Sequence, residues 1–216
     1  MIRALFFDLD GTLLNSKKEI SPTTKDTLRK CTDKGYKLFV ATARPPRLGR
    51  MLSWDDDTQN LFAGGVYYNG GCIIVDRDKS YIPIADNTAE KIINFVLECD
   101  NLNIALQMEE EKHAFRLPLN DKFYKGWGIF ADEALTLYQR NSMKIIKIVI
   151  FYANLIDSTQ LINDNIVATL NKLSEYPLSF AMGNAEQQVK SVAKYIALDN
   201  DADGIHEAII NTLNLL

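Results

Sequence analysis

The chain has 216 residues, of which 47% are hydrophobic, and a formal net charge of −4 at pH 7. This length suits one domain, or one domain with a second one inserted, and the hydrophobic share is enough for a buried core. The small negative charge gives no overall basic field to attract nucleic acid or an anionic membrane, and no apolar run approaches the roughly 18 residues of a membrane span.

The three cysteines, Cys31, Cys72 and Cys99, are odd in number and widely spaced. They therefore predict neither a disulfide framework nor a CxxC metal site, and we interpret them as reduced thiols of a cytoplasmic protein. A strand is predicted almost at the first residue, so a signal peptide is not expected. We expect a monomer or a weak homodimer, with no nucleic-acid partner and no membrane partner.

The N-terminal part alternates strands and helices. A buried strand is predicted over residues 2–7. Ser21-Pro22-Thr23 has the N-cap residue and the proline that begin a helix, which we expect to run to about Asp33. A second strand follows at 36–40, so this βαβ unit predicts two parallel, adjacent strands. Further elements are expected as a helix at 47–54, strands at 66–68 and 72–75 around the hairpin turn Asn69-Gly70-Gly71, a turn at 77–80 and a strand at 81–84.

The pattern changes after about residue 84 and favours a separate α+β module inserted into the first domain. Its expected elements are a helix at 88–99, strands at 103–108 and 113–117, a possible helix at 131–139, a strand at 144–152 and a long helix at 157–174. The chain then returns to a core-like pattern, with strands at 178–182 and 195–198 and helices at 185–194 and 204–215. The predicted parts are a core at 1–83, the inserted module at 84–176 and the rest of the core at 177–216.

Two aspartates, Asp8 and Asp10, directly follow the apolar run of the first strand. Residues two apart in a strand point to the same side, so both carboxylates are expected at the strand's C-terminal end, where open α/β sheets bind ligands. Gly11 allows a sharp turn there. Two close carboxylates repel each other unless a proton or a cation lies between them. The pattern therefore favours a divalent metal with a phosphorylated substrate over the alternative, an Asp-rich turn.

Four segments resemble those of one family. Asp8-Leu9-Asp10-Gly11-Thr12-Leu13 resembles the first signature of the haloacid dehalogenase (HAD) superfamily, most of whose members are phosphatases. Ala41-Thr42-Ala43-Arg44 resembles its second motif. Tyr68-Asn69-Gly70-Gly71 is similar to a turn of the Cof-type phosphatases with a class IIB cap, and residues 180–205 resemble the C-terminal signature of that subgroup. The resemblance implies a three-layer α/β, Rossmann-like core with an inserted α+β cap.

The resemblance also implies a mechanism. Asp8, which is ionised at pH 7, would be the nucleophile that forms an aspartyl-phosphate, and Asp10 would be the general acid and base. Mg²⁺ would be held by Asp8 and Asp10. The expected phosphate and substrate contacts are Leu9, Thr42, Ala43, Arg44 and Asn69. The predicted reaction is hydrolysis of a small phosphomonoester, a sugar phosphate or related metabolite; a phosphomutase and a catalytically impaired protein that only binds phosphorylated metabolites are the alternatives.

Two of the family's motifs are absent from the sequence. No Lys-Gly pair follows the cap, and the dipeptide Gly-Asp, which begins the motif that completes the metal site, occurs nowhere. The gap falls between about Leu173 and Phe180, where a strand and helix of roughly 30 residues would be needed. We interpret it as an internal segment that the natural protein has and this sequence lacks. As written, the chain is expected to bind Mg²⁺ poorly and to turn over slowly. His113, His206 and the acidic runs 55–57 and 109–111 are expected to be packing or solvated residues.

Overall fold

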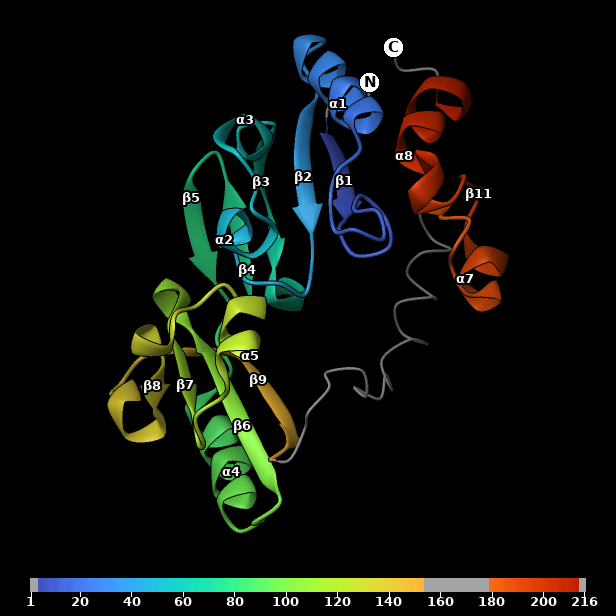
Figure 1. Ribbon diagram of the computed structural model, residues 1–216. Coiled ribbons are helices and arrows are strands. Elements are labelled where there is room, and N and C mark those ends of the chain that lie inside the picture. The colour runs from blue at the N-terminus through green and yellow to red at the C-terminus, as the bar shows by residue number, and fades with distance from the viewer. Residues whose placement is uncertain (1–3, 154–178, 214–216) are drawn as a thin grey trace. The chain divides into compact units, whose positions relative to one another are not determined.

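The computed structural model describes residues 4–153 and 179–213 (Figure 1). The described chain divides into two compact units, one of residues 4–41, 60–63 and 179–213 and the other of residues 42–59 and 64–153. Each unit is described by itself below. The boundaries predicted at residues 84 and 176 stay a prediction, and the helix expected at 157–174 lies outside the described residues.

The first unit begins with the predicted βαβ arrangement. β1 (Ala4–Asp8) pairs in parallel with β2 (Lys37–Ala41), and Asp8 lies opposite Ala41. Between them, α1 (Pro22–Asp33) begins as predicted, because the Ser21 side chain accepts a hydrogen bond from the Thr24 backbone N–H at 3.1 Å. The apolar side chains of this arrangement form the core, and the fully buried ones include Leu9, Leu14, Leu28, Cys31 and Leu38.

The C-terminal elements of the first unit are short. They are β10 (Phe180–Ala181), α7 (Gln187–Val192), β11 (Tyr195–Ile196) and α8 (Gly204–Glu207), which continues as a π-helical turn over Ala208–Thr212. Each agrees in type with the sequence prediction but is shorter. α8 packs against α1. In the described part of the chain, β10 and β11 form a parallel sheet with each other alone, and β1 pairs with β2 alone.

A five-stranded sheet has the order β1-β2-β3-β4-β5, with β3 (Phe62–Tyr67), β4 (Cys72–Val75) and β5 (Asp78–Tyr81) forming antiparallel pairs. The predicted turn at 77–80 and strand at 81–84 were wrong. The turn is the two-residue loop Asp76-Arg77, in which both residues have positive φ and Val75 pairs with Asp78. A loop of this kind matches the twist of the strands, so β5 starts three residues earlier than predicted.

Two short helices connect β2 to β3. α2 (Leu48–Leu52) lies within the predicted 47–54, and α3 (Asp56–Gln59) falls where a solvated acidic loop was expected. Asp55 is the reason for this second helix, because its carboxylate accepts a hydrogen bond from the Thr58 backbone N–H at 2.8 Å.

The rest of the second unit is an α+β module, as predicted. Its elements are α4 (Asp86–Leu97), β6 (Leu102–Met108), β7 (His113–Phe115), α5 (Asp121–Gly126), β8 (Leu135–Thr136) and β9 (Ile145–Tyr152), and its sheet has the order β8-β7-β6-β9. Alternate residues of β6 face opposite sides: Ile104 and Leu106 pack in the cluster that contains Ile93 of α4, whereas Ala105 packs with Tyr124 of α5. Helices therefore cover both faces of β6, which explains why it is buried along almost all of its length (Figure 1).

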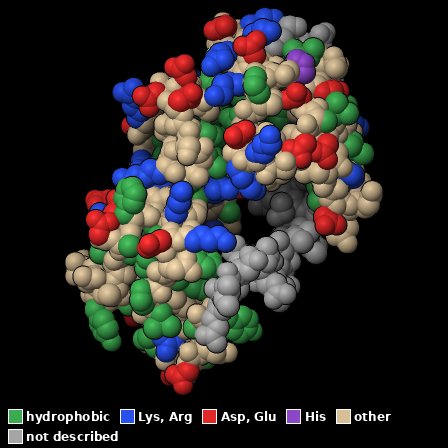
Figure 2. All heavy atoms as spheres, in the orientation of Figure 1, with side chains coloured by type: hydrophobic (Ala, Val, Ile, Leu, Met, Phe, Trp, Pro, Cys, Tyr) green, Lys and Arg blue, Asp and Glu red, His purple; other side chains and the backbone are tan. Residues whose placement is uncertain are grey.

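The helix predicted at 131–139 was wrong. Two 3₁₀ turns, Ala131–Glu133 and Leu137–Arg140, flank β8, which pairs in parallel with β7. Pairing with β7 is a tertiary interaction, and it overrides the local preference. Among the described residues, no helix has both the length and the apolar character needed to cross a membrane. Charges of both signs occur on the face seen in Figure 2, in keeping with the small net charge.

Candidate active site

As the sequence predicts, Asp8 and Asp10 lie at the C-terminal end of β1, and both are exposed. The chain turns immediately afterwards at Gly11, which has φ +76°. The Thr12 hydroxyl donates to Asp8 Oδ2 at 3.0 Å and so orients this carboxylate. Lys18 Nζ lies 2.9 Å from Asp10 Oδ1, an exposed ion pair of little energetic weight. The predicted pair of carboxylates is thus presented at the end of the strand, each with a partner of its own.

Thr42 follows Ala41, the residue that pairs with Asp8 across the two strands. Its side chain is buried, and its Oγ1 accepts a hydrogen bond from the Arg44 backbone N–H at 3.2 Å. Because that bond uses a lone pair, the Thr42 O–H remains a donor for an anionic oxygen. A hydrogen bond from the Thr42 backbone N–H to the Val66 carbonyl, at 2.8 Å, fixes the start of the loop that contains Thr42 and Arg44.

Asn69 lies beside this loop, since its N–H donates to the Thr42 carbonyl at 3.2 Å and the Tyr68 N–H donates to the Arg44 carbonyl at 3.1 Å. The predicted Asn-Gly hairpin turn lies at Tyr68–Gly70 between β3 and β4, and Tyr68 and Asn69 both have positive φ there. The second unit therefore brings together four of the predicted residues: Thr42, Ala43, Arg44 and Asn69. Leu9, also expected at the phosphate, is fully buried, backbone included, so no part of it is exposed to a ligand in this structure.

Sequence reasoning missed Lys147. This residue is the third of β9, and its Nζ donates to the Ala43 carbonyl at 3.1 Å. Burial lowers the pKa of its ammonium group. A cation is thus held against the backbone between Thr42 and Arg44. The signal in the sequence was a lysine inside the apolar run Ile-Ile-Lys-Ile-Val-Ile, which otherwise reads only as a strand.

The C-terminal segment holds the loop that follows β1. Asn184 Nδ2 donates to the Gly11 carbonyl at 2.9 Å, and Asn200 Nδ2 donates to the Leu14 carbonyl at 2.8 Å. Asp201 accepts from the Ser16 backbone N–H at 2.7 Å, and Asp203 accepts from the hydroxyl groups of Ser21 and Thr24. These side chains therefore fix the loop.

The oxygen ligands at the end of β1 suit Mg²⁺, which is usually bound by one or two carboxylates together with substrate phosphates and water. Asp8 and Asp10 supply two carboxylates of this type. Within residues 4–153 and 179–213, no group of three or more His, Cys, Asp or Glu side chains is placed to hold a metal ion. The carboxylate oxygens therefore fit Mg²⁺. Among the described residues, Asp8 and Asp10 are the two that would hold it.

Comparisons with known proteins agree on the family. A model of the haloacid dehalogenase-like hydrolases matches residues 5–174 and 170–209. The phosphoglycolate phosphatase of Nitrosopumilus maritimus is 25% identical over 233 positions, which cover 96% of this chain and 94% of that protein.

Two solved structures share the fold. One is a hypothetical protein from Geobacillus kaustophilus, with a TM-score of 0.76 and 18% identity over 100% of both chains. The other is the HAD subclass IIB sugar phosphatase BT4131, with a TM-score of 0.71 and 20% identity over 99% of this chain and 100% of that one. The predicted fold, a Rossmann-like core with an inserted α+β module, and the predicted enzyme class are confirmed. This chain belongs to the haloacid dehalogenase-like hydrolases.

Proposed function

We propose that this hydrolase cleaves small phosphoric monoesters, sugar phosphates or related metabolites, through an aspartyl-phosphate on Asp8 and with Mg²⁺. The observation that carries the proposal is the register of β1 and β2. Asp8 lies opposite Ala41, so Thr42 continues the neighbouring strand at the same edge of the sheet. The carboxyl ends of parallel strands are where ligands bind in this type of sheet.

In the proposed reaction, a carboxylate oxygen of Asp8 attacks phosphorus while the bond from phosphorus to the leaving oxygen breaks, and Asp10 donates a proton to that oxygen. Asp10 then takes a proton from water, which attacks the phosphoryl group and restores Asp8. The Thr42 O–H, the Arg44 guanidinium and the Lys147 ammonium would hold the phosphoryl oxygens, with Ala43 and Asn69 shaping the loop. Bound Mg²⁺ would supply charge neutralisation and orientation.

The names of the relatives support this substrate class, since the similar proteins are described as a phosphoglycolate phosphatase and a sugar phosphatase. Both imply a small phosphorylated metabolite. The expected cytoplasmic location and the expected monomer or weak homodimer stay predictions.

A second candidate is a protein that binds phosphorylated metabolites with little turnover. It is favoured by the absence, among the described residues, of a third carboxylate for the metal. The two stretches matched by the family model overlap at 170–174, and the alignment with the Nitrosopumilus protein is longer than this chain. Both support our interpretation that a strand and helix are missing near this point, and the separation of β10 and β11 from β1 is consistent with it.

The test is steady-state hydrolysis of p-nitrophenyl phosphate with Mg²⁺ by the full chain, by Asp8→Asn and by Asp26→Asn, an exposed aspartate on α1. We expect Asp8→Asn to lower kcat by about 10³-fold or more and Asp26→Asn to leave it unchanged. Binding of a sugar phosphate without phosphate release would favour the second candidate. Transfer of the phosphoryl group to a sugar hydroxyl in preference to water would indicate a phosphomutase.

A further inference from the structure

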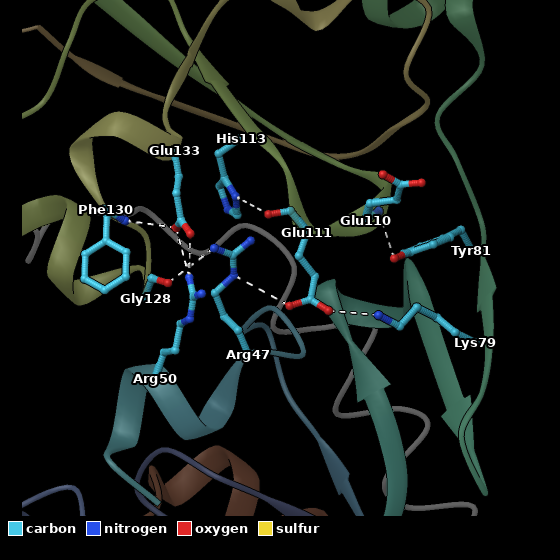
Figure 3. A network of polar contacts seen from close by, with 10 residues as sticks. All are labelled: Arg47, Arg50, Lys79, Tyr81, Glu110, Glu111, His113, Gly128, Phe130 and Glu133. Carbon is cyan, nitrogen blue, oxygen red and sulfur yellow. Dashed lines mark hydrogen bonds and ion pairs between the residues drawn. The ribbon is translucent and has the colours of Figure 1, made fainter.

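The second unit contains a cavity of about 340 Å³ next to α2. Its walls come from α2, from the connection between β6 and β7, and from the segment after α5 (Figure 3). The residues that matter here are Arg47, Arg50, Glu111, His113, Ile129 and Glu133. Arg47 is three residues after Arg44, so the cavity begins within about 11 Å of chain from the loop that carries Thr42.

Two buried polar atoms in the cavity wall have no hydrogen-bond partner among the described residues: Arg47 Nε and His113 Nε2. His113 is 1% exposed and the Arg47 side chain is 9% exposed. The ring and the guanidinium lie next to each other in Figure 3. Glu111 Oε2 lies 3.7 Å from Arg47 Nε, which is within ion-pair distance but too long for a hydrogen bond.

The chemistry of these two atoms is fixed by their surroundings. His113 Nδ1 lies 3.1 Å from the Glu111 carbonyl, which only accepts, so Nδ1 carries the proton. Burial, followed by the charge of Arg47, lowers the pKa of His113 to about 4, so the ring is neutral near pH 7. His113 Nε2 is therefore an acceptor, and Arg47 Nε–H is a donor. A hydroxyl group is the simplest group that satisfies both.

The charges around the cavity balance. Three cationic residues and three acidic residues line it, and Lys112 and Glu110 complete these two sets. Arg50 Nη1 lies 2.9 Å from both carboxylate oxygens of Glu133, and Lys79 Nζ lies 2.8 Å from Glu111. Arg47 Nε also lies within ion-pair distance of Glu111, and the three acidic residues equal the three cationic residues in number, so the cavity has no surplus positive charge for a phosphate. It suits a neutral group that carries hydroxyls.

We propose that this cavity receives the hydroxyl-bearing, uncharged part of the substrate, with one hydroxyl that donates to His113 Nε2 and accepts from Arg47 Nε–H. This inference rests on the proposed phosphatase function, because the phosphoryl group would lie at the Thr42 loop. It makes His113 and Arg47 specificity-determining residues that act on the leaving group. A single buried water would satisfy the same two atoms, and it is the alternative that the experiment must exclude.

The test compares sorbitol 6-phosphate with hexyl phosphate, which have the same carbon chain and differ in hydroxyl groups. Their affinities are measured by calorimetry on the Asp8→Asn chain, so that the result does not depend on turnover. Asn at position 113 keeps a donor at the place of Nδ1 but has no acceptor at the place of Nε2, whereas Gln keeps that acceptor. His206→Asn, at the histidine that contacts Thr27, is the matched control.

We expect tighter binding of sorbitol 6-phosphate than of hexyl phosphate, a loss of about fivefold to tenfold of this preference in His113→Asn, and its recovery in His113→Gln. His206→Asn should keep the preference. Equal affinities for the two esters, or an unchanged preference in both His113 variants, would overturn the inference and leave water as the occupant. Failure of the phosphatase function would appear separately, as absent turnover of p-nitrophenyl phosphate by the chain with Asp8 intact.

Discussion

Substitution of Lys147 by methionine removes the half-buried cation beside the Thr42 loop and keeps the approximate length of the side chain. Lys147 Nζ lies 3.1 Å from the Ala43 carbonyl. In the proposed complex, the same ammonium group also faces the phosphoryl oxygens. A hydrogen bond to a charged group contributes about 1.5–3 kcal/mol. We therefore expect kcat/KM for p-nitrophenyl phosphate to fall by about 10-fold to 150-fold, since 1.36 kcal/mol corresponds to tenfold.

We expect Lys147→Met to change the free energy of unfolding much less than it changes kcat/KM. Loss of the bond from the charged ammonium to Ala43 costs about 1.5 kcal/mol, whereas removal of this half-buried ammonium relieves the desolvation that lowers its pKa. These two effects oppose each other, so we expect the free energy of unfolding to change by less than about 1 kcal/mol. Urea denaturation of Lys147→Met measures it. A large fall in kcat/KM with unchanged stability distinguishes a residue that binds phosphate from one that only supports the fold.

Two control variants complete this experiment. Lys147→Arg keeps the charge and should retain more activity than Lys147→Met. Lys144→Met, at an exposed position just before β9, should have the activity of the unaltered chain. If Lys147→Met keeps kcat/KM within twofold while inorganic phosphate inhibits it as before, then Lys147 has no part in binding the phosphoryl group.

Three further predictions concern the fold. Gly64→Ala should lower the free energy of unfolding, measured by urea denaturation, by about 3 kcal/mol or more, because an added Cβ would lie 1.9 Å from the Ile74 carbonyl oxygen. Gly70→Ala, where the space is open, should cost less, and equal losses in the two variants would contradict the reasoning. His113 has a pKa of about 4 in the folded chain, so between pH 6.5 and 4 the unfolded chain binds more protons than the folded one. The free energy of unfolding should therefore decrease by up to about 3 kcal/mol as the pH falls through this range. Urea denaturation of His113→Gln at several pH values should show a smaller decrease. Asn200→Ala removes the bond to the Leu14 carbonyl and should lower the free energy of unfolding by about 1 kcal/mol; no change would mean that water replaces the amide.

Local signals predicted the fold well where they were sufficient by themselves. Ser21 and Pro22 fixed the start of α1, and the alternation of apolar strands and helices gave the βαβ unit and the α+β module. Prediction failed where distant residues decide. β8 exists because it pairs with β7, and the loop at Asp76-Arg77 required two residues in the left-handed region, a conformation that Asp tolerates but that Arg77 does not signal.

The residues of the candidate site also fall into those that local sequence signals predict and those that only the three-dimensional structure reveals. The places of Asp8, Asp10 and Thr42 could be predicted, because Asp8 ends β1, Asp10 lies two residues beyond it, Thr42 directly follows β2, and each matches a family motif. Lys147 could not, because it is 104 residues away from Ala43 in the sequence and its contact is visible only in three dimensions. His113 was expected to be a packing or surface residue; it is buried, but its ring nitrogen also lines a cavity.

The central claim is that Asp8 takes up the phosphoryl group covalently. The most direct measurement uses Asp10→Asn, in which the base for hydrolysis is lost, incubated with p-nitrophenyl phosphate and Mg²⁺, quenched in acid and digested for mass spectrometry. We predict that the peptide that contains Asp8 gains one PO₃ unit, and that the double variant with Asp8→Asn does not. Steady turnover by the unaltered chain, with that peptide never phosphorylated in Asp10→Asn, would contradict the account.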